Sequence, residues 1–113
     1  MDYMEIKFID NHCIITPLSP RLGERESYRL SDEIQKNSMF QIGLDLSYVK
    51  DCTFDFINML SNIEDISLFN IPSDIFSIFI IMDLDKSLNI FTSELDFTEN
   101  KNRLINRKLA LVA

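Results

Sequence analysis

The chain has 113 residues, of which 46% are hydrophobic and 26% are charged, and its formal net charge is −7. That length suffices for one hydrophobic core, so we expect residues 1–113 to form a single domain. The acidic balance argues against a nucleic-acid-binding protein, which requires a basic surface. The longest apolar run, Ile78–Met82, is too short to span a bilayer, and the acidic N-terminus is unlike a secretory leader. We therefore expect a cytoplasmic protein without direct membrane insertion.

Hydrophobic periodicity and turn residues predict the order of elements. Strands are predicted where short apolar or alternating runs end at turn residues: Met4–Ile9, Cys13–Thr16, Gln41–Leu46, Ile66–Phe69 and Leu88–Phe91. Helices are predicted from apolar faces and helix-start residues: Glu24–Lys36, Thr53–Ile63, Pro72 to about Met82, and one that begins at Thr92-Ser93-Glu94. A strand is the alternative for the third helix, because that segment is rich in β-branched and aromatic residues.

This order, ββαβαβαβα, predicts an α/β fold. Strands that are separated by helices imply right-handed crossovers, so the predicted sheet is mixed and mostly parallel, with about five strands and about four helices. The chain contains only two glycines, which excludes the Gly-rich loops of dinucleotide-binding and P-loop proteins.

The segment Gln41–Ile63 carries most of the information about function. A short apolar strand leads into a polar turn that places Asp51, Cys52 and Thr53 at the start of the second helix. Unpaired backbone N–H groups and the positive end of the helix dipole meet there, so a phosphate on Thr53 would be well tolerated. The alternative is that Thr53 or Asp51 only caps the helix, or that Asp51 holds an Asx turn.

Neither metal binding nor catalysis is predicted. Cys52 is interpreted as a small buried hydrophobic residue, although a place near a helix N-terminus would lower its pKa and suit a redox sensor. A single histidine and two cysteines that are far apart in the sequence predict no metal site. The acids are scattered and no nucleophile elbow is present, so the sequence predicts no catalytic residue and no cofactor.

The third helix has more apolar surface than one sheet face requires. Ile71–Met82 is apolar almost all round, and Phe76, Phe79 or Ile80 would be exposed in a monomer, depending on the rotation of the helix. The surplus predicts either a dimer or partner surface, or a surface that the C-terminal helix covers with its apolar side chains: Leu104, Ile105, Leu109 and Leu111.

The end of the chain is basic. Residues 99–113 carry one acid and four bases, in contrast to the acidic remainder of the chain. We expect a basic C-terminal helix or tail at 99–113 that either docks on a partner or a second copy, or is simply solvated.

Residues 44–60, LDLSYVKDCTFDFINML, resemble the STAS-domain pattern hLDLSxVxxhDSSGLxxLL, in which h is an apolar residue. The rest of the chain is similar to the same family in order: Arg21-Leu22 with the acidic first helix, Ile66–Asn70 with Pro72-Ser73, and Ile75 to Leu84 with Leu88–Phe91. The STAS family includes bacterial anti-sigma factor antagonists and cytoplasmic modules of sulphate transporters. In its phosphorylatable members, a Ser or Thr at the start of the second helix is modified by a partner kinase that is also the anti-sigma factor.

By position, the resemblance implies that Thr53 is the phosphoacceptor and that Asp51, Cys52, Thr53 and Phe54 bind the partner. Phe54 stands where the family has a glycine, and Cys52 stands where it has its first serine. A phenylalanine crowds the loop that a kinase must approach, and Asp55 adds a negative charge close to any phosphate.

The favoured function is a non-catalytic regulatory domain that binds an anti-sigma factor or a serine/threonine kinase-like protein and is switched by phosphorylation at Thr53. One alternative is a constitutive subunit of a larger assembly or transporter complex that has lost the switch, which the residues at 52 and 54 favour. The remaining alternative is a small enzyme or nucleotide-binding protein that uses Asp51, Cys52 and Asp55.

Overall fold

The computed structural model describes residues 3–84 and 87–104. Its strands are β1 (Met4–Ile9), β2 (His12–Pro17), β3 (Arg21–Leu22), β4 (Gln41–Asp45), β5 (Asp51–Cys52), β6 (Ile66–Phe69) and β7 (Asn89–Ile90). Its helices are α1 (Glu24–Lys36), α2 (Phe54–Ser61), α3 (Ser73–Ile81) and α4 (Glu94–Glu99). Of these, β1, α1 and β6 have the predicted bounds, and α3 is a helix, so the alternative of a strand there is wrong.

Five strands form one sheet in the order β1-β2-β4-β6-β7. β1 and β2 are antiparallel, and the other neighbouring strands are parallel. The two-residue turn Asp10-Asn11 allows the first pair to form a hairpin, whereas a helix connects each later pair. The predicted mixed, mostly parallel sheet of five strands with four helices is confirmed.

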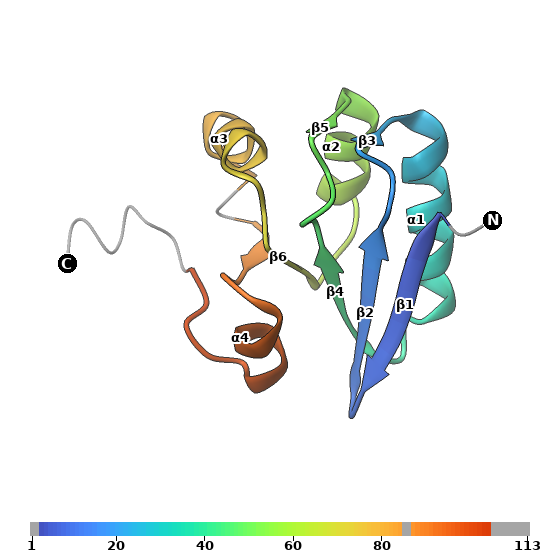
Figure 1. Cartoon of the computed structure of the whole chain (residues 1–113), viewed down its shortest axis with the longest axis vertical. Coiled ribbons are helices and arrows are strands. Elements are labelled where there is room, and N and C mark those ends of the chain that lie inside the picture. Colours follow the sequence, from blue (N-terminus) through green and yellow to red (C-terminus); the bar gives the residue numbers. More distant parts are fainter. Residues whose placement is uncertain (1–2, 85–86, 105–113) are drawn as a thin grey trace.

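The sheet is covered on both faces, but unequally. Helices α1, α2 and α3 contribute with the strands to the main core, in which alternate strand residues such as Ile15, Leu44 and Leu68 are completely buried. The opposite face holds a smaller core, in which Phe97 of α4 packs with Ile14, Phe69 and Phe91. Figure 1 shows α4 apart from the other three helices.

Gly43 lies where α4 approaches the central strand β4. A Cβ atom at this position would lie 2.6 Å from Cε2 of Phe97. The Phe97 ring is held in place by the rings of His12, Phe69 and Phe91, at centroid distances of 5.0, 5.6 and 5.7 Å. The glycine therefore permits the close contact that seals this face of the sheet.

We expect Gly43→Ala to lower the free energy of unfolding by about 1–3 kcal/mol, because the added methyl group overpacks the contact with Phe97. Gly23→Ala is the matched control. A Cβ atom there would lie 3.2 Å from Oε1 of Glu26, which is the end of a flexible side chain, so the loss should be smaller. Urea denaturation of both variants checks the expectation, and equal losses would contradict it.

A second, two-stranded sheet was not predicted. β3 and β5 pair in parallel, with Arg21 opposite Asp51 and Leu22 opposite Cys52. Strands of two residues have no hydrophobic period, and their pairing depends on segments that are far apart in the sequence. The turn predicted at Asp51-Cys52 is therefore a strand.

The structure determines the rotation of α3. Ile75 and Phe79, which are four residues apart, are buried in the main core, and Phe76 is half-buried against it. The prediction of an exposed surface is wrong for Phe79, because this residue lies on the face of the helix that packs against the sheet. Ile80 is exposed together with neighbouring residues: Ile78, Ile81 and Met82. In the described residues, no helix is long and apolar enough to cross a membrane.

The predicted C-terminal helix is short. It begins as expected after Ser93, whose hydroxyl accepts a hydrogen bond from the backbone N–H of Asp96, and it ends at Glu99. Leu104 follows it, packs against the main core and donates a backbone hydrogen bond of 2.7 Å to Ile90. Residues 105–113, including Ile105, Leu109 and Leu111 and most of the basic tail, lie outside the described part of the chain.

Candidate functional site

The candidate site is built on the loop between β4 and α2. Asp45, the last residue of β4, accepts hydrogen bonds at Oδ1 from the backbone N–H of Ser47 (3.0 Å) and from Nδ2 of Asn70 (3.2 Å). Leu46 and Val49 are buried, and the N–H of Leu46 donates to the carbonyl oxygen of Phe69 at 3.1 Å. The start of the loop is therefore part of the core, and only its tip is open to solvent.

The second half of the loop is held by β3 and the residue before it. The carbonyl oxygen of Pro20 accepts from the N–H groups of Lys50 (2.7 Å) and Asp51 (3.1 Å). The carbonyl oxygen of Leu22 accepts from the N–H of Thr53 at 3.0 Å. These bonds place Thr53 at the point where β3 ends and α2 begins.

Thr53 occupies the N-cap position of α2. Its hydroxyl lies 3.3 Å from the carbonyl oxygen of Leu22 and 3.4 Å from Oδ2 of Asp55, and it can donate to either. It accepts no hydrogen bond from the helix. Within the described residues, no group accepts a bond from the backbone N–H of Phe54 or of Asp55. The helix start thus keeps open donors beside a hydroxyl that does not cap it.

Asp51 does not form the predicted Asx turn. It lies in β5, its side chain is exposed, and its Oδ1 is 4.0 Å from Nε of Arg21. At that distance on the surface, the ion pair contributes little to stability. The Asx-type contact in this loop belongs to Asp45 instead.

Two aromatic side chains stand out from the loop. Tyr48 is 57% exposed and Phe54, directly after the hydroxyl, is 69% exposed. Large apolar groups that are exposed next to a polar functional group are typical anchors for a protein partner. We call the set Tyr48, Asp51, Thr53, Phe54 and Asp55 the loop surface.

Cys52 is half-buried and packs against the main core. Burial raises the pKa of its thiol, and the negative charge of Asp51 raises it further. A raised pKa keeps this thiol protonated at neutral pH, so the interpretation as a small apolar residue fits better than that of a redox sensor. Cys13 is completely buried, both thiols are free, and no group of three metal-ligating side chains occurs among the described residues.

We expect the rate of alkylation of Cys52 by iodoacetamide to reach half of its maximum above pH 9.0, the ordinary pKa of the thiol, because only the thiolate reacts. Peptide mass mapping of the native protein separates Cys52 from Cys13. The same titration in concentrated urea is the control and should move toward the ordinary value. A midpoint below it in the folded protein would mean that the helix N-terminus stabilises the thiolate.

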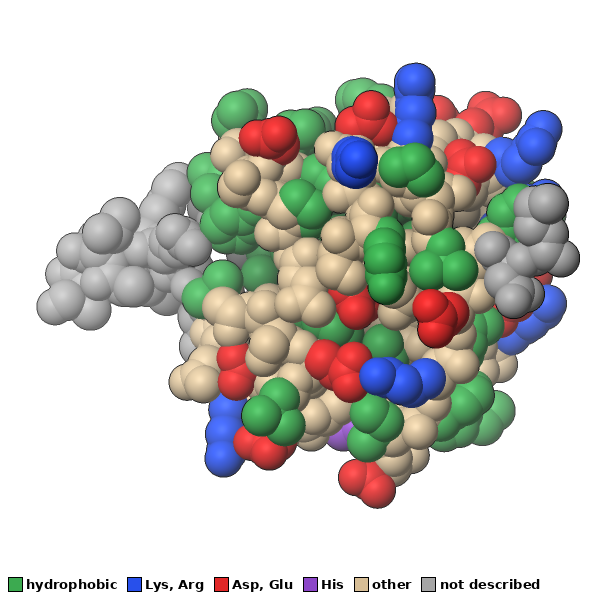
Figure 2. Space-filling model, in the orientation of Figure 1, with side chains coloured by type: hydrophobic (Ala, Val, Ile, Leu, Met, Phe, Trp, Pro, Cys, Tyr) green, Lys and Arg blue, Asp and Glu red, His purple; other side chains and the backbone are tan. Residues whose placement is uncertain are grey.

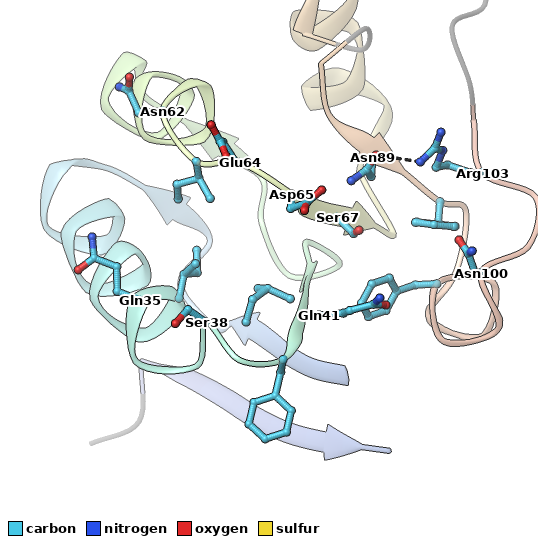
Figure 3. Close-up of a pocket in the computed structure, with 16 residues that line it drawn as sticks. Gln35, Ser38, Gln41, Asn62, Glu64, Asp65, Ser67, Asn89, Asn100 and Arg103 are labelled. Carbon is cyan, nitrogen blue, oxygen red and sulfur yellow. Dashed lines mark hydrogen bonds between the residues drawn. The ribbon is translucent and has the colours of Figure 1, made fainter. Parts of the chain in front are cut away.

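A cavity of about 550 Å³ lies at the other end of the parallel strands (Figure 3). Carboxamides from several elements line it, with one guanidinium, Arg103, which donates to Oδ1 of Asn89 at 3.1 Å. Two acids, Glu64 and Asp65, lie on its wall. The sequence reasoning missed this cavity, because single carboxamides on separate segments form no motif.

Comparison with known proteins identifies a solved structure with a similar fold. No family model matches the chain, and no curated protein matches it. Among solved structures, the crystal structure of a candidate anti-sigma factor antagonist from Thermotoga maritima aligns with a TM-score of 0.75. The alignment covers 86% of this chain and 92% of that one, at 15% sequence identity. The chain has the fold of that protein.

The STAS-like fold expected from residues 44–60 is thereby confirmed as a fold. The likeness at 15% identity is one of fold.

Proposed function

We propose that this protein is a regulatory STAS-like domain that acts by binding another protein and is switched by phosphorylation of Thr53. One observation carries the proposal: the Thr53 hydroxyl stands at the start of α2 without capping it, beside N–H groups that have no acceptor in the described residues. A phosphate attached there would find open donors and the positive end of the helix dipole.

The partner that we propose is an anti-sigma factor or a serine/threonine kinase-like protein of the bacterial cytoplasm. In the unmodified state, the exposed ring of Phe54 and the start of α2 would dock on it. Phosphorylation adds about two negative charges at pH 7. Because Asp51 and Asp55 are already on the loop surface, the added charge would make docking unfavourable through repulsion and desolvation.

Phe54 is the clearest departure from the STAS pattern. A phenylalanine at this position was expected to crowd the loop that a kinase must approach, and the position of its side chain reduces that difficulty. The side chain is 69% exposed and so projects from the loop instead of filling it. A kinase would have to accommodate the ring, and a partner could use it as an anchor. We therefore treat Phe54 as a specificity residue of the proposed interface.

The first test is the covalent state of the protein isolated from its native cells. We expect one phosphate on the peptide that contains Thr53, found by intact mass and peptide mapping across 51–63. Thr53→Ser should retain the phosphate, and Thr53→Ala should lose it. Thr98→Ala is the matched control, because the Thr98 hydroxyl is exposed and already donates to the carbonyl oxygen of Leu95. No phosphate under any growth or stress condition would refute the switch.

The second test is the affinity for the partner. The partner is first recovered from native cells by cross-linking to the Thr53→Ala variant, and its binding is then measured by calorimetry. We expect Thr53→Asp and Phe54→Ala each to weaken binding at least about tenfold, which corresponds to about 1.4 kcal/mol. Tyr28→Ala is the control, since Tyr28 is a 77% exposed aromatic residue of α1 outside the loop surface. If Tyr28→Ala weakened binding and the other two variants did not, the loop surface would not be the interface.

A second candidate function rests on α3. Hydrophobic side chains gather over this helix (Figure 2), where Ile80 is 42% and Ile81 is 81% exposed. This surface fits a constitutive subunit of a larger assembly or transporter complex that has lost the switch. In that case Ile81→Asp would abolish assembly, whereas Thr53→Asp would leave it unchanged. No observation in the structure favours the enzyme or the nucleotide-binding alternative over these two.

A further inference from the structure

β1 is an edge strand, and within the described residues nothing pairs with its outer side. Figure 1 shows it as the last strand on the side of the sheet away from β6. It is six residues long, and Ile6 and Phe8 are 36% and 54% exposed. An exposed edge of this length is a template for another strand. The other edge is different, because β7 has two residues and Leu104 forms a bridge to Ile90.

The hairpin determines which backbone groups of β1 face outward. Ile9 and His12 flank a two-residue turn. The pair that closes such a turn exchanges hydrogen bonds, and bonded and non-bonded pairs then alternate along the hairpin. The hydrogen bond of 3.0 Å from Leu18 N to Tyr3 O, six residues before Ile9, agrees with this alternation.

The alternation divides the residues of β1 into two sets, according to the direction of their backbone N–H and C=O groups. The backbone groups of Glu5 and Lys7 are directed at β2, whereas the N–H and C=O groups of Met4, Ile6 and Phe8 are directed at the free edge. The outward groups therefore form an evenly spaced row over the whole strand.

The side chains of these two sets lie on opposite faces of the sheet. Lys7 Nζ forms an ion pair of 2.9 Å with Glu94 Oε2 of α4, so Lys7 and Glu5 lie on the α4 face. Phe8 contacts the ring of Phe40 at a centroid distance of 5.0 Å on the opposite face, which Met4 and Ile6 share.

We infer that β1 pairs antiparallel with β1 of a second copy of this chain, with Ile6 opposite Ile6, and joins the two sheets into one. In this register Met4 lies opposite Phe8 of the second copy, so all outward N–H and C=O groups are paired. Glu5 then lies opposite Lys7 of the second copy, and the same contact recurs on the other side of the two-fold axis. These positions are non-hydrogen-bonded pairs, in which opposing side chains approach most closely.

The charges select this register. A shift of the second strand by two residues in one direction brings Glu5 opposite Glu5, and a shift in the other direction brings Lys7 opposite Lys7. Like charges directly opposite each other are destabilising. The described part of each copy has one such edge, so the assembly closes as a two-fold dimer and does not extend into a filament.

The test is analytical ultracentrifugation of the full chain over a range of concentrations. Glu94→Gln is the reference background, since it removes the ion pair within one copy and should leave the dimer intact. On that background, Glu5→Lys or Lys7→Glu alone should raise the dimer Kd by about tenfold or more, because two attractive pairs become repulsive. The double variant Glu5→Lys/Lys7→Glu should restore the dimer. A monomer up to millimolar concentration, or a dimer that ignores both single variants, would overturn the inference.

Amide hydrogen exchange supplies a second readout that does not depend on substitution. Raising the protein concentration should slow exchange at Met4, Ile6 and Phe8, and should leave Glu5 and Lys7 unchanged, because β2 already protects them. A slowing confined to the amides of α3 would place the contact on that helix and would overturn the pairing of β1.

Discussion

The central strand β4 is buried on both faces, and this constraint shapes the rest of the molecule. Leu44 on one face is completely buried under the main core, and Gly43 on the other lies against the ring of Phe97. β2 and β6 pair with its two sides in parallel, so β4 has no free edge. A strand that is enclosed in this way cannot shift its register without exposing its apolar side chains. The loop that follows β4 therefore begins from a fixed point.

That fixed start explains why the loop surface is well defined although its tip is exposed. The main-chain bonds of Leu46 and Thr53 to Phe69 and Leu22 join the loop to two separate parts of the fold. The backbone is held, and the side chains of Tyr48 and Phe54 are left in solvent. A rigid backbone with exposed side chains suits recognition, because little conformational entropy is lost when a partner binds.

The low sequence identity to the Thermotoga maritima protein, 15%, is compatible with a TM-score of 0.75 because the two quantities depend on different residues. The fold requires apolar residues at a given spacing and close packing, and many side chains meet those requirements. Function depends on a few particular groups. At two such positions, this chain has Cys52 and Phe54 where the STAS pattern has serine and glycine, and neither difference prevents the fold from forming.

Local patterns in the sequence were sufficient for the order of the main elements and for the bounds of β1, α1 and β6. Each of these has a hydrophobic period or a charge pattern within its own length, such as Glu24 and Glu26 in the first turn of α1 and Lys36 in its last. The position of Thr53 at the start of a helix followed from the same kind of signal. Other features depend on contacts between distant segments: the pairing of β3 with β5, the burial of Phe79, the cavity lined by carboxamides and the free edge of β1. The apolar run in α3 predicted that the helix packs against the core, but not which side chains face it, because an almost wholly apolar helix has no preferred face of its own.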